Sequence, residues 1–175
     1  MATISKKICM VGDFGVGKTS LIRRYVEREF SDRYLSTVGV KISRKTIETI
    51  NENRQDAVKL QLIIWDLEGH TRFKAIAPSY LQGAAGALVV ADVTRVETIE
   101  NLKERIGLFS SVNPKSSIAV AFNKTDLVVE SQLEKIPQYF DVSRFPNVIS
   151  SYFTSAKTGN NVDEIFEKLA QKLIS

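Results

Sequence analysis

Residues Gly12-Asp13-Phe14-Gly15-Val16-Gly17-Lys18-Thr19 match the pattern of a phosphate-binding loop, in which Lys and then Ser or Thr follow the second of two glycines. The apolar run Lys7–Val11 before this segment predicts a buried strand, and apolar residues recur at helical spacing after it, to about Glu27. Strand, glycine-rich turn and helix form the context in which this motif binds phosphate. The segment therefore predicts a phosphate site at the start of an α/β domain.

Each residue type in the loop has a defined role in phosphate binding. Glycines let the backbone turn its N–H groups toward phosphate oxygens, and the following helix adds the positive end of its dipole. We expect Lys18 to reach the β- and γ-phosphates and Thr19 to offer its hydroxyl to Mg²⁺. A chance glycine turn beside a surface lysine is the alternative. The candidate nucleotide contacts in this segment are Asp13, Phe14, Gly15, Val16, Gly17, Lys18, Thr19 and Ser20.

The composition is that of an ordinary globular protein, with 175 residues of which 43% are hydrophobic and 25% charged. We therefore expect one domain over residues 1–175. The formal net charge of +4 comes without a concentrated basic run, so nucleic-acid binding is not expected. Cys9 is the single cysteine and lies in an apolar strand, which favours a core residue over a reactive thiol. We expect no secretory signal and no membrane-spanning segment, and hence a cytoplasmic protein.

Strand and helix patterns alternate along the rest of the chain. Two alternating strands, from about Val38 to Ile50 and from Leu60 to Asp66, flank the polar turn Asn51–Asp56 and predict an antiparallel hairpin. A capping box is expected where the last helix begins, with Glu164 three residues after Asn161. The other expected elements are a loop from Phe30 to Gly39, a loop with a short helix from Leu67 to Ala77, strands over 84–92, 118–123 and 148–153, helices around 99–109 and 131–140, and a last helix that buries Val162, Ile165, Phe166, Leu169 and Leu173.

The order of these elements predicts an α/β fold of the P-loop NTPase type. Alternating strands and helices, with several continuously apolar strands, indicate a mainly parallel sheet covered by helices on both faces. We expect six strands, one of them an antiparallel edge strand from the hairpin. Ligands bind beyond the carboxyl ends of the strands in such sheets. The phosphate loop, Asp66, Asn123–Asp126 and Ser155–Lys157 each follow a different strand, so we expect them to converge on one rim.

Asp66 is the expected metal residue of the third strand. It closes the apolar run Ile63-Ile64-Trp65, and a phosphate-loop protein holds Mg²⁺ at such a position, usually through water. An aspartate that merely starts a turn is the alternative.

The segment Asn123-Lys124-Thr125-Asp126 indicates a guanine base. A carboxylate at Asp126 can accept hydrogen bonds from the N1–H and the 2-amino group of guanine, a pair of donors that adenine lacks. Asn123 can tie this segment to the phosphate loop, and the stem of Lys124 can lie along the base. Ser155-Ala156-Lys157 would complete the pocket, with the N–H of Ala156 meeting the guanine O6.

The segments Gly12–Leu21, Ser36–Val40, Trp65-Asp66, Gly69, Arg72-Phe73, Asn123–Leu127 and Thr154–Gly159 carry a family resemblance. Through them the chain resembles the Ras-like small GTPases over nearly its whole length, and the Rab branch most closely. The resemblance implies GTP and GDP as ligands, with Mg²⁺, and a small G-protein fold. It also implies that Thr37 binds Mg²⁺ and the γ-phosphate only in the GTP state, that Gly69 donates its N–H to the γ-phosphate, and that Phe30 packs against the guanine. Loss of the γ-phosphate would release Thr37 and Gly69, which is the switch.

Three residues expected near the γ-phosphate depart from the family pattern. The family usually has glutamine where this chain has His70, and that glutamine orients the attacking water. His70 either positions water through a ring nitrogen or is an exposed loop residue without a catalytic role. Glu68 stands where the family usually has alanine and can pair with Lys18 when the γ-phosphate is absent, whereas Phe14 replaces a small residue and can crowd an arginine finger from a partner.

These departures predict a GTP-binding switch with slow or atypical hydrolysis. The alternative is a GTP-binding interaction module without significant hydrolysis, and a phosphate-loop kinase or ATPase is a more distant one. The resemblance implies His70, Gly69, Lys18 and Thr37 as the catalytic residues, and Thr19, Thr37 and Asp66 as the metal residues.

The resemblance also implies protein partners. Effectors are expected to contact Ile42, Trp65, Phe73 and Tyr80. Rab proteins carry a hydrophobic triad at the positions of Ile42, Trp65 and Tyr80, although Ile42 replaces an aromatic residue. An exchange factor and an activating protein are implied as well. Lys172-Leu173-Ile174-Ser175 holds no cysteine and Ala2 is not a myristoylation site, so we expect no direct lipid anchor. We expect a monomer that acts in the cytoplasm or is brought to a membrane by a partner.

Overall fold

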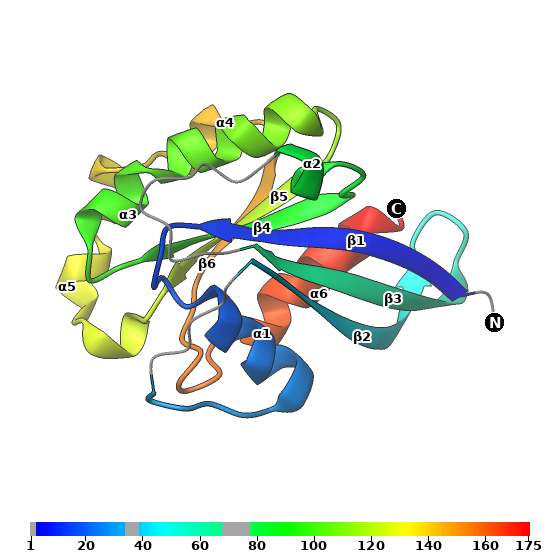
Figure 1. Ribbon diagram of the computed structural model, residues 1–175, viewed down its shortest axis with the longest axis horizontal. Helices are drawn as coiled ribbons and strands as arrows, with labels where there is room; N and C mark the ends of the chain where they lie inside the picture. Colours follow the sequence, from blue (N-terminus) through cyan, green and yellow to red (C-terminus); the bar gives the residue numbers. More distant parts are fainter. Residues whose placement is uncertain (1–2, 34–38, 68–77) are drawn as a thin grey trace.

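The computed structural model describes residues 3–33, 39–67 and 78–175 (Figure 1). Within these residues, six strands form one sheet in the order β2-β3-β1-β4-β5-β6. The elements in chain order are β1 (Thr3–Gly12), α1 (Lys18–Glu27), β2 (Val40–Asn51), β3 (Asp56–Leu67), α2 (Pro78–Leu81), β4 (Gly86–Asp92), α3 (Val96–Glu100), α4 (Leu102–Val112), β5 (Ser117–Asn123), the 3₁₀ turn η1 (Thr125–Leu127), α5 (Glu130–Leu133), the 3₁₀ turns η2 (Ile136–Gln138) and η3 (Val142–Arg144), β6 (Val148–Phe153) and α6 (Val162–Leu173).

The sheet is mainly parallel, as the sequence predicted. β1 runs parallel to both β3 and β4, and β4, β5 and β6 continue the parallel order. β2 is the antiparallel edge strand, and its last residue Asn51 pairs with Asp56 across the predicted turn. The Asn51 side-chain oxygen accepts hydrogen bonds from the N–H groups of Asn53 and Arg54 at 3.0 and 3.1 Å, which closes the turn.

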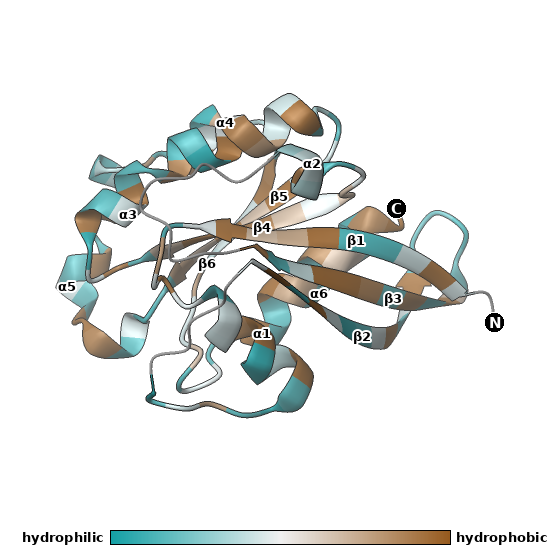
Figure 2. Ribbon diagram, viewed as in Figure 1, coloured by the Kyte–Doolittle hydropathy of each residue, from teal (hydrophilic) through white to brown (hydrophobic). Residues whose placement is uncertain are grey.

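Helices cover the sheet on both faces, so its central strands are buried on both sides. Figure 1 shows α3 and α4 on one side of the sheet and α1 and α6 on the other. Every residue of β4 is buried, and Figure 2 shows its apolar colouring beside the polar outer faces of the helices. On the α1–α6 side, the rings of Tyr25 and Phe166 stack with centroids 4.2 Å apart. This packing holds the carboxyl ends of the strands in a rigid frame.

Two predicted helices differ from the structure. The helix expected over 131–140 is a single turn, α5, followed by the 3₁₀ turn η2. Pro137 fits this break, because proline has no N–H with which to continue the hydrogen bonds of α5. The helix expected around 99–109 is divided into α3 and α4, which meet at Asn101.

The predicted capping box at the start of α6 is wrong. Asn161 lies in the left-handed backbone region at φ 58°, and its side chain makes no capping hydrogen bond. Its Nδ2 instead donates to the carbonyl of Phe153 at 2.9 Å, which ties α6 to the end of β6. At the other end of α6, Leu173 is only partly buried and the following Ile174 takes the buried position.

Other expectations fall partly outside the described residues. Leu67 is the last residue of β3, while the short helix expected before Ala77 lies outside the described ranges. Residues 30–33 and Gly39 have no helix or strand, in agreement with the predicted loop. Cys9 is completely buried, and burial raises the pKa of its thiol to about 12, so it is the expected core residue. In the described parts of the chain, no helix has the length and apolar character needed to cross a membrane.

Candidate functional site

The carboxyl ends of β1, β3, β5 and β6 meet around a cavity of about 300 Å³. Four segments that are far apart in the sequence contribute to its wall, as the strand order predicted. Of the candidate residues that the structure describes, Asp13, Val16 and Ser155 lie outside the lining. The candidate residues that line the cavity are Phe14, Gly15, Gly17, Lys18, Thr19, Ser20, Phe30, Asp66, Asn123, Lys124, Asp126, Ala156 and Lys157.

Close backbone approaches explain the glycines of the phosphate loop. Gly17 has a φ of 102°, and a Cβ there would lie 2.3 Å from the Nδ2 of Asn123. A Cβ on Gly12 would lie 2.4 Å from the carbonyl oxygen of Val90 in the neighbouring strand. Any side chain at these positions would push the loop away from β4 or from Asn123.

Lys18 and Thr19 follow the loop at the start of α1. The Lys18 ammonium donates to the carbonyls of Gly12 and Asp13 at 2.8 and 2.9 Å, so it lies across the mouth of the loop. The Thr19 hydroxyl donates to the carboxylate of Asp66 at 2.5 Å.

This pair of oxygen groups fits a magnesium ion. Mg²⁺ prefers hard oxygen ligands and keeps several waters, so one hydroxyl and one carboxylate beside a phosphate form a suitable donor set. Asp66 is 1% exposed at the end of β3, and Thr19 directly follows Lys18. The residues present therefore fit the ion that the loop motif implies.

The base end of the cavity is fixed by side chains of the predicted guanine segment. The Ser155 hydroxyl donates to the Asp126 carboxylate at 2.7 Å, which sets the direction of that carboxylate. Asn123 donates to the carbonyl of Val16 at 3.0 Å and accepts from the Thr154 hydroxyl at 3.0 Å. The expected tie between Asn123 and the phosphate loop is present.

Arg24 is a site residue that the sequence did not reveal. From α1, where Arg24 is partly buried, its guanidinium donates to the carbonyl of Ala156 at 2.7 Å, and also to that of Lys157. The partners lie more than a hundred positions away along the chain, so no local pattern connects them to Arg24.

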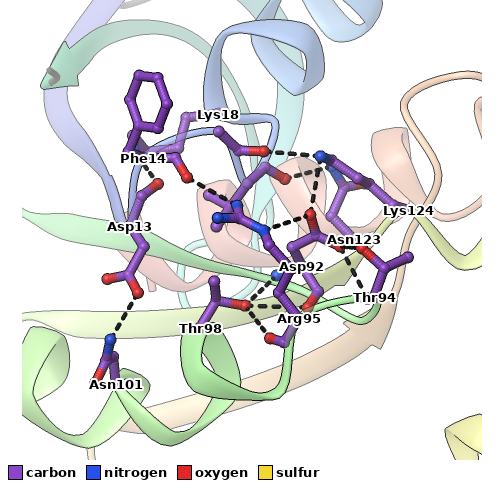
Figure 3. Close-up of polar contacts among 12 residues, drawn as sticks. Asp13, Phe14, Lys18, Asp92, Thr94, Arg95, Thr98, Asn101, Asn123 and Lys124 are labelled. Atoms are coloured by element: carbon purple, nitrogen blue, oxygen red, sulfur yellow. Dashed lines mark hydrogen bonds and ion pairs between the residues drawn. The ribbon is translucent and has the colours of Figure 1, made fainter. Parts of the chain in front are cut away.

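A polar network on the α3–α4 side holds the phosphate loop, and the sequence did not reveal it either (Figure 3). The Asp13 carboxylate accepts from Asn101 at 2.7 Å and from Arg105 at 2.9 Å, so it points to α4. Arg95 donates to the carbonyl of Phe14 at 2.7 Å and to the Asp92 carboxylate at 3.1 Å. These contacts join the loop to α4 and to the turn before α3.

Asp92 is the buried anion of this network. It is 1% exposed, and its carboxylate accepts from both the N–H and the hydroxyl of Thr94. It also forms an ion pair of 2.9 Å with Lys124. Burial by itself raises the pKa of this carboxyl, but the hydrogen bonds from Thr94 and Lys124 outweigh burial and hold the pKa below its ordinary value.

The expected switch and effector residues are only partly described. Thr37, Glu68, Gly69, His70 and Phe73 lie outside the described residues. On the described surface, Ile42 and Tyr80 are 41% and 44% exposed. Ile42 pairs across the hairpin with Trp65, whose ring lies 3.8 Å from the Lys7 ammonium.

Known proteins resemble this chain over most of its length. The family described as "Ras of Complex, Roc, domain of DAPkinase" matches residues 7–126. Rab-22A of Mus musculus is 35% identical over 179 aligned residues, which cover 100% of this chain and 87% of that protein. GTP-binding protein ypt5 of Schizosaccharomyces pombe is 37% identical, with 99% of this chain and 80% of that protein covered, and Rab-31 of Rattus norvegicus is 31% identical, with 99% and 85% covered.

The chain belongs to the Ras-like small GTPases.

Some properties are general in the Ras-like family to which this chain belongs. Ras-like and Rab-like proteins are GTPases that act as GTP-binding switches, and Mg²⁺ is the usual metal of the family. Rab-like GTPases generally interact with effectors, exchange factors and activating proteins. The resemblance read from the sequence is thus confirmed, and the six-stranded sheet agrees with the small GTPase fold.

Proposed function

We propose that this small GTPase binds GTP and GDP with Mg²⁺ in the cavity at the carboxyl end of the sheet, and that it hydrolyses GTP slowly. One observation carries the proposal. The carboxylate oriented by Ser155, the lysine at the mouth of the glycine loop and the Thr19–Asp66 oxygen pair line one cavity. A guanine, a polyphosphate and a metal ion have that order along a guanine nucleotide.

Base selection would come from Asp126. Its carboxylate already accepts one hydrogen bond from Ser155, and its remaining lone pairs can accept the N1–H and 2-amino hydrogens of guanine. The backbone N–H of Ala156 supports recognition of O6, because Ala156 lines the same cavity. Phe30 also lines it and is available to pack against the base.

Phosphate binding would come from the loop and Lys18. Backbone N–H groups in the loop and the start of α1 supply partial positive charge, and the Lys18 ammonium adds a full one. Thr19 and Asp66 would hold the ion, which neutralises phosphate charge when it is bound. Thr37 and Gly69 are proposed as the groups that sense the γ-phosphate.

Slow hydrolysis is the finer part of the proposal. The Phe14 side chain is 42% exposed and lines the cavity, so it occupies space through which a partner's arginine would approach. An arginine finger contributes about 10³–10⁵ in rate, so its exclusion would leave only intrinsic turnover. His70 would replace the water-orienting glutamine with a shorter and differently shaped group.

The test compares single-turnover GTP hydrolysis of wild type, His70→Gln and His70→Ala. We expect His70→Gln to hydrolyse GTP about tenfold faster or more, because an amide can orient the attacking water. Equal rates for wild type and His70→Gln would refute slow hydrolysis through His70. A wild-type rate above that of His70→Ala would show that the imidazole positions water, whereas equal rates would assign it no catalytic role.

The nucleotide carried by the purified protein separates a switch from a pure binding module. GDP in the protein indicates turnover, whereas GTP retained over hours with Mg²⁺ indicates the interaction module.

For partners, we propose an effector surface that includes Ile42, Trp65 and Tyr80, supported by the exposure of Ile42 and Tyr80. An Ile42→Asp variant that still captured a GTP-dependent partner with full affinity would refute this surface.

A further inference from the structure

Three successive carbonyls of the phosphate loop are each held by a side chain from outside the loop. Two of these side chains belong to the guanine segment, in which Asn123 was expected to tie to the loop and Lys124 was expected to lie along the base. The third, Arg95, comes from the turn before α3 and belongs to no recognised motif. The contacts are Arg95 Nη2 to the carbonyl of Phe14 at 2.7 Å, Lys124 Nζ to that of Gly15 at 2.7 Å, and Asn123 Nδ2 to that of Val16 at 3.0 Å.

Holding these carbonyls also sets the direction of the loop N–H groups. In a planar trans peptide the C=O and the next N–H point to opposite sides, and the described chain has no cis peptide. A carbonyl of Phe14 that points to Arg95 therefore turns the N–H of Gly15 the other way. The same argument applies to the N–H groups of Val16 and Gly17, and successive N–H groups that point to one side can bind an anion.

Asp92 links two of the three holding side chains. One oxygen of its carboxylate, Oδ2, lies 3.1 Å from Arg95 Nε and 2.9 Å from Lys124 Nζ. The other oxygen, Oδ1, accepts from Thr94. Because Asp92 is buried at the end of β4, it fixes both cations to the rigid part of the sheet (Figure 3).

We propose that Asp92 and Arg95 are positioning residues of the phosphate loop, which aim its N–H groups at the nucleotide phosphates and thereby slow nucleotide release. The inference rests on the proposed nucleotide binding in this cavity. Arg95 itself does not line the cavity and acts through the backbone of Phe14. Asp92 acts one step further away, through Arg95 and Lys124.

A purely local role for Arg95 would be an ion pair within its own turn, three residues after Asp92. The bond to Phe14 spans 81 positions and joins the α3 turn to the loop, so Arg95 does more than close that turn. The chain offers a matched control, since Arg144 and Asp141 form another ion pair with the same spacing on an exposed turn. Arg144 is 81% exposed, and no contact to the loop is found for it.

The experiment measures release of a fluorescent GDP analogue, with Mg²⁺ present, from wild type, Arg95→Gln, Asp92→Asn and Arg144→Gln. We expect release about three- to tenfold faster from Arg95→Gln, the usual effect of one lost hydrogen bond. Asp92→Asn is expected to release faster still, because it frees both cations. Arg144→Gln is expected to match wild type.

Amide hydrogen exchange of the GDP-bound proteins separates positioning from general loosening. We expect faster exchange at Gly15 and Val16 in Arg95→Gln, with unchanged protection of the buried strand β4. Unchanged GDP release from Arg95→Gln would overturn the inference, as would equally increased exchange in β4.

If Asp92→Asn does not fold, the result for Arg95→Gln alone decides whether the inference holds. Wild type that binds no GDP analogue would remove the proposed function and this inference with it, whereas wild-type binding with wild-type release from Arg95→Gln would remove only the inference.

Discussion

Arg24 contacts two carbonyls of the proposed base-binding segment, those of Ala156 and Lys157. Across the trans peptide that joins these residues, the Lys157 N–H points opposite to the Ala156 carbonyl. Arg24 thus holds the outer side of a segment whose inner side lines the cavity. We infer that Arg24 shapes the proposed base pocket without facing the base.

Replacement of Arg24 by methionine tests this role, because methionine keeps much of the side-chain length and removes the donors. We expect GDP binding to weaken by about tenfold, as for the loss of one or two hydrogen bonds to neutral groups. IDP carries the same O6 as GDP but lacks the 2-amino group, so it should weaken by the same factor. We expect the GDP-to-IDP affinity ratio, which we propose that Asp126 sets, to be unchanged.

The neighbouring Arg23→Met is the matched control for Arg24→Met. Arg23 pairs with the exposed carboxylates of Glu27 and Glu29 and lies on the same helix. We expect it to bind GDP and IDP as wild type does in a competition assay. A GDP-to-IDP ratio that collapses in Arg24→Met would mean a distorted pocket and would contradict the specific role of Arg24.

At the scale of elements, hydrophobic patterns predicted the strands better than the helices. Strand β4 is buried on both faces, so it had to be continuously apolar. The strand predicted over 84–92 includes all of β4, which begins two residues later, at Gly86. α5 is a single helical turn, and the apolar spacing around it reflects packing of irregular backbone rather than one helix. Asn161 looked like a helix cap, but a tertiary contact to Phe153 uses its side chain. Local sequence cannot show which of two partners a polar side chain takes.

The same limit applied to the candidate site. Lys18, Asp66 and Asp126 could be predicted because each stands in a recognisable motif, and all three line the same cavity. Arg24 and Arg95 could not, because each contacts the backbone of a distant segment, and any residue type can supply a carbonyl. Residues that position a site through backbone contacts leave no matching signal at the partner position.

Helix α1, which directly follows the phosphate loop, packs against α6. Phe166 of α6 is completely buried and stacks on Tyr25 of α1, with the ring planes 2° apart. Truncation to Phe166→Ala would leave a cavity beneath the helix that begins at Lys18. We expect the free energy of unfolding to fall by about 3–5 kcal/mol, measured by urea denaturation at a fixed, saturating GDP concentration.

Phe153→Ala is the comparison variant, because Phe153 is 38% exposed at the end of β6. Folding buries less apolar surface at Phe153 than at Phe166. The free energy of unfolding should therefore fall by less than half as much as in Phe166→Ala. Equal losses in the two variants would show that burial between α1 and α6 is not what makes Phe166 important.

At the scale of the whole molecule, the candidate ligand would join four strand ends that the chain brings together only when it folds. The cavity takes residues from the ends of β1, β3, β5 and β6, and the unfolded chain cannot gather them. A ligand that binds only the folded state stabilises it in proportion to the logarithm of its concentration. Nucleotide binding should therefore be visible as a change in global stability.

We expect GDP with Mg²⁺, at about a hundredfold its dissociation constant, to add about 2.7 kcal/mol to the stability of nucleotide-free protein. For a chain of this size that corresponds to a rise of about 5–10 °C in the midpoint of thermal unfolding, measured by differential scanning fluorimetry. ATP at the same concentration should give little or no rise, because adenine lacks the donors that Asp126 accepts. Asp126→Ala should keep the midpoint of the nucleotide-free wild type and lose most of the GDP effect. An equal rise with ATP would contradict the assignment of Asp126 and favour a phosphate-binding site that does not read the base.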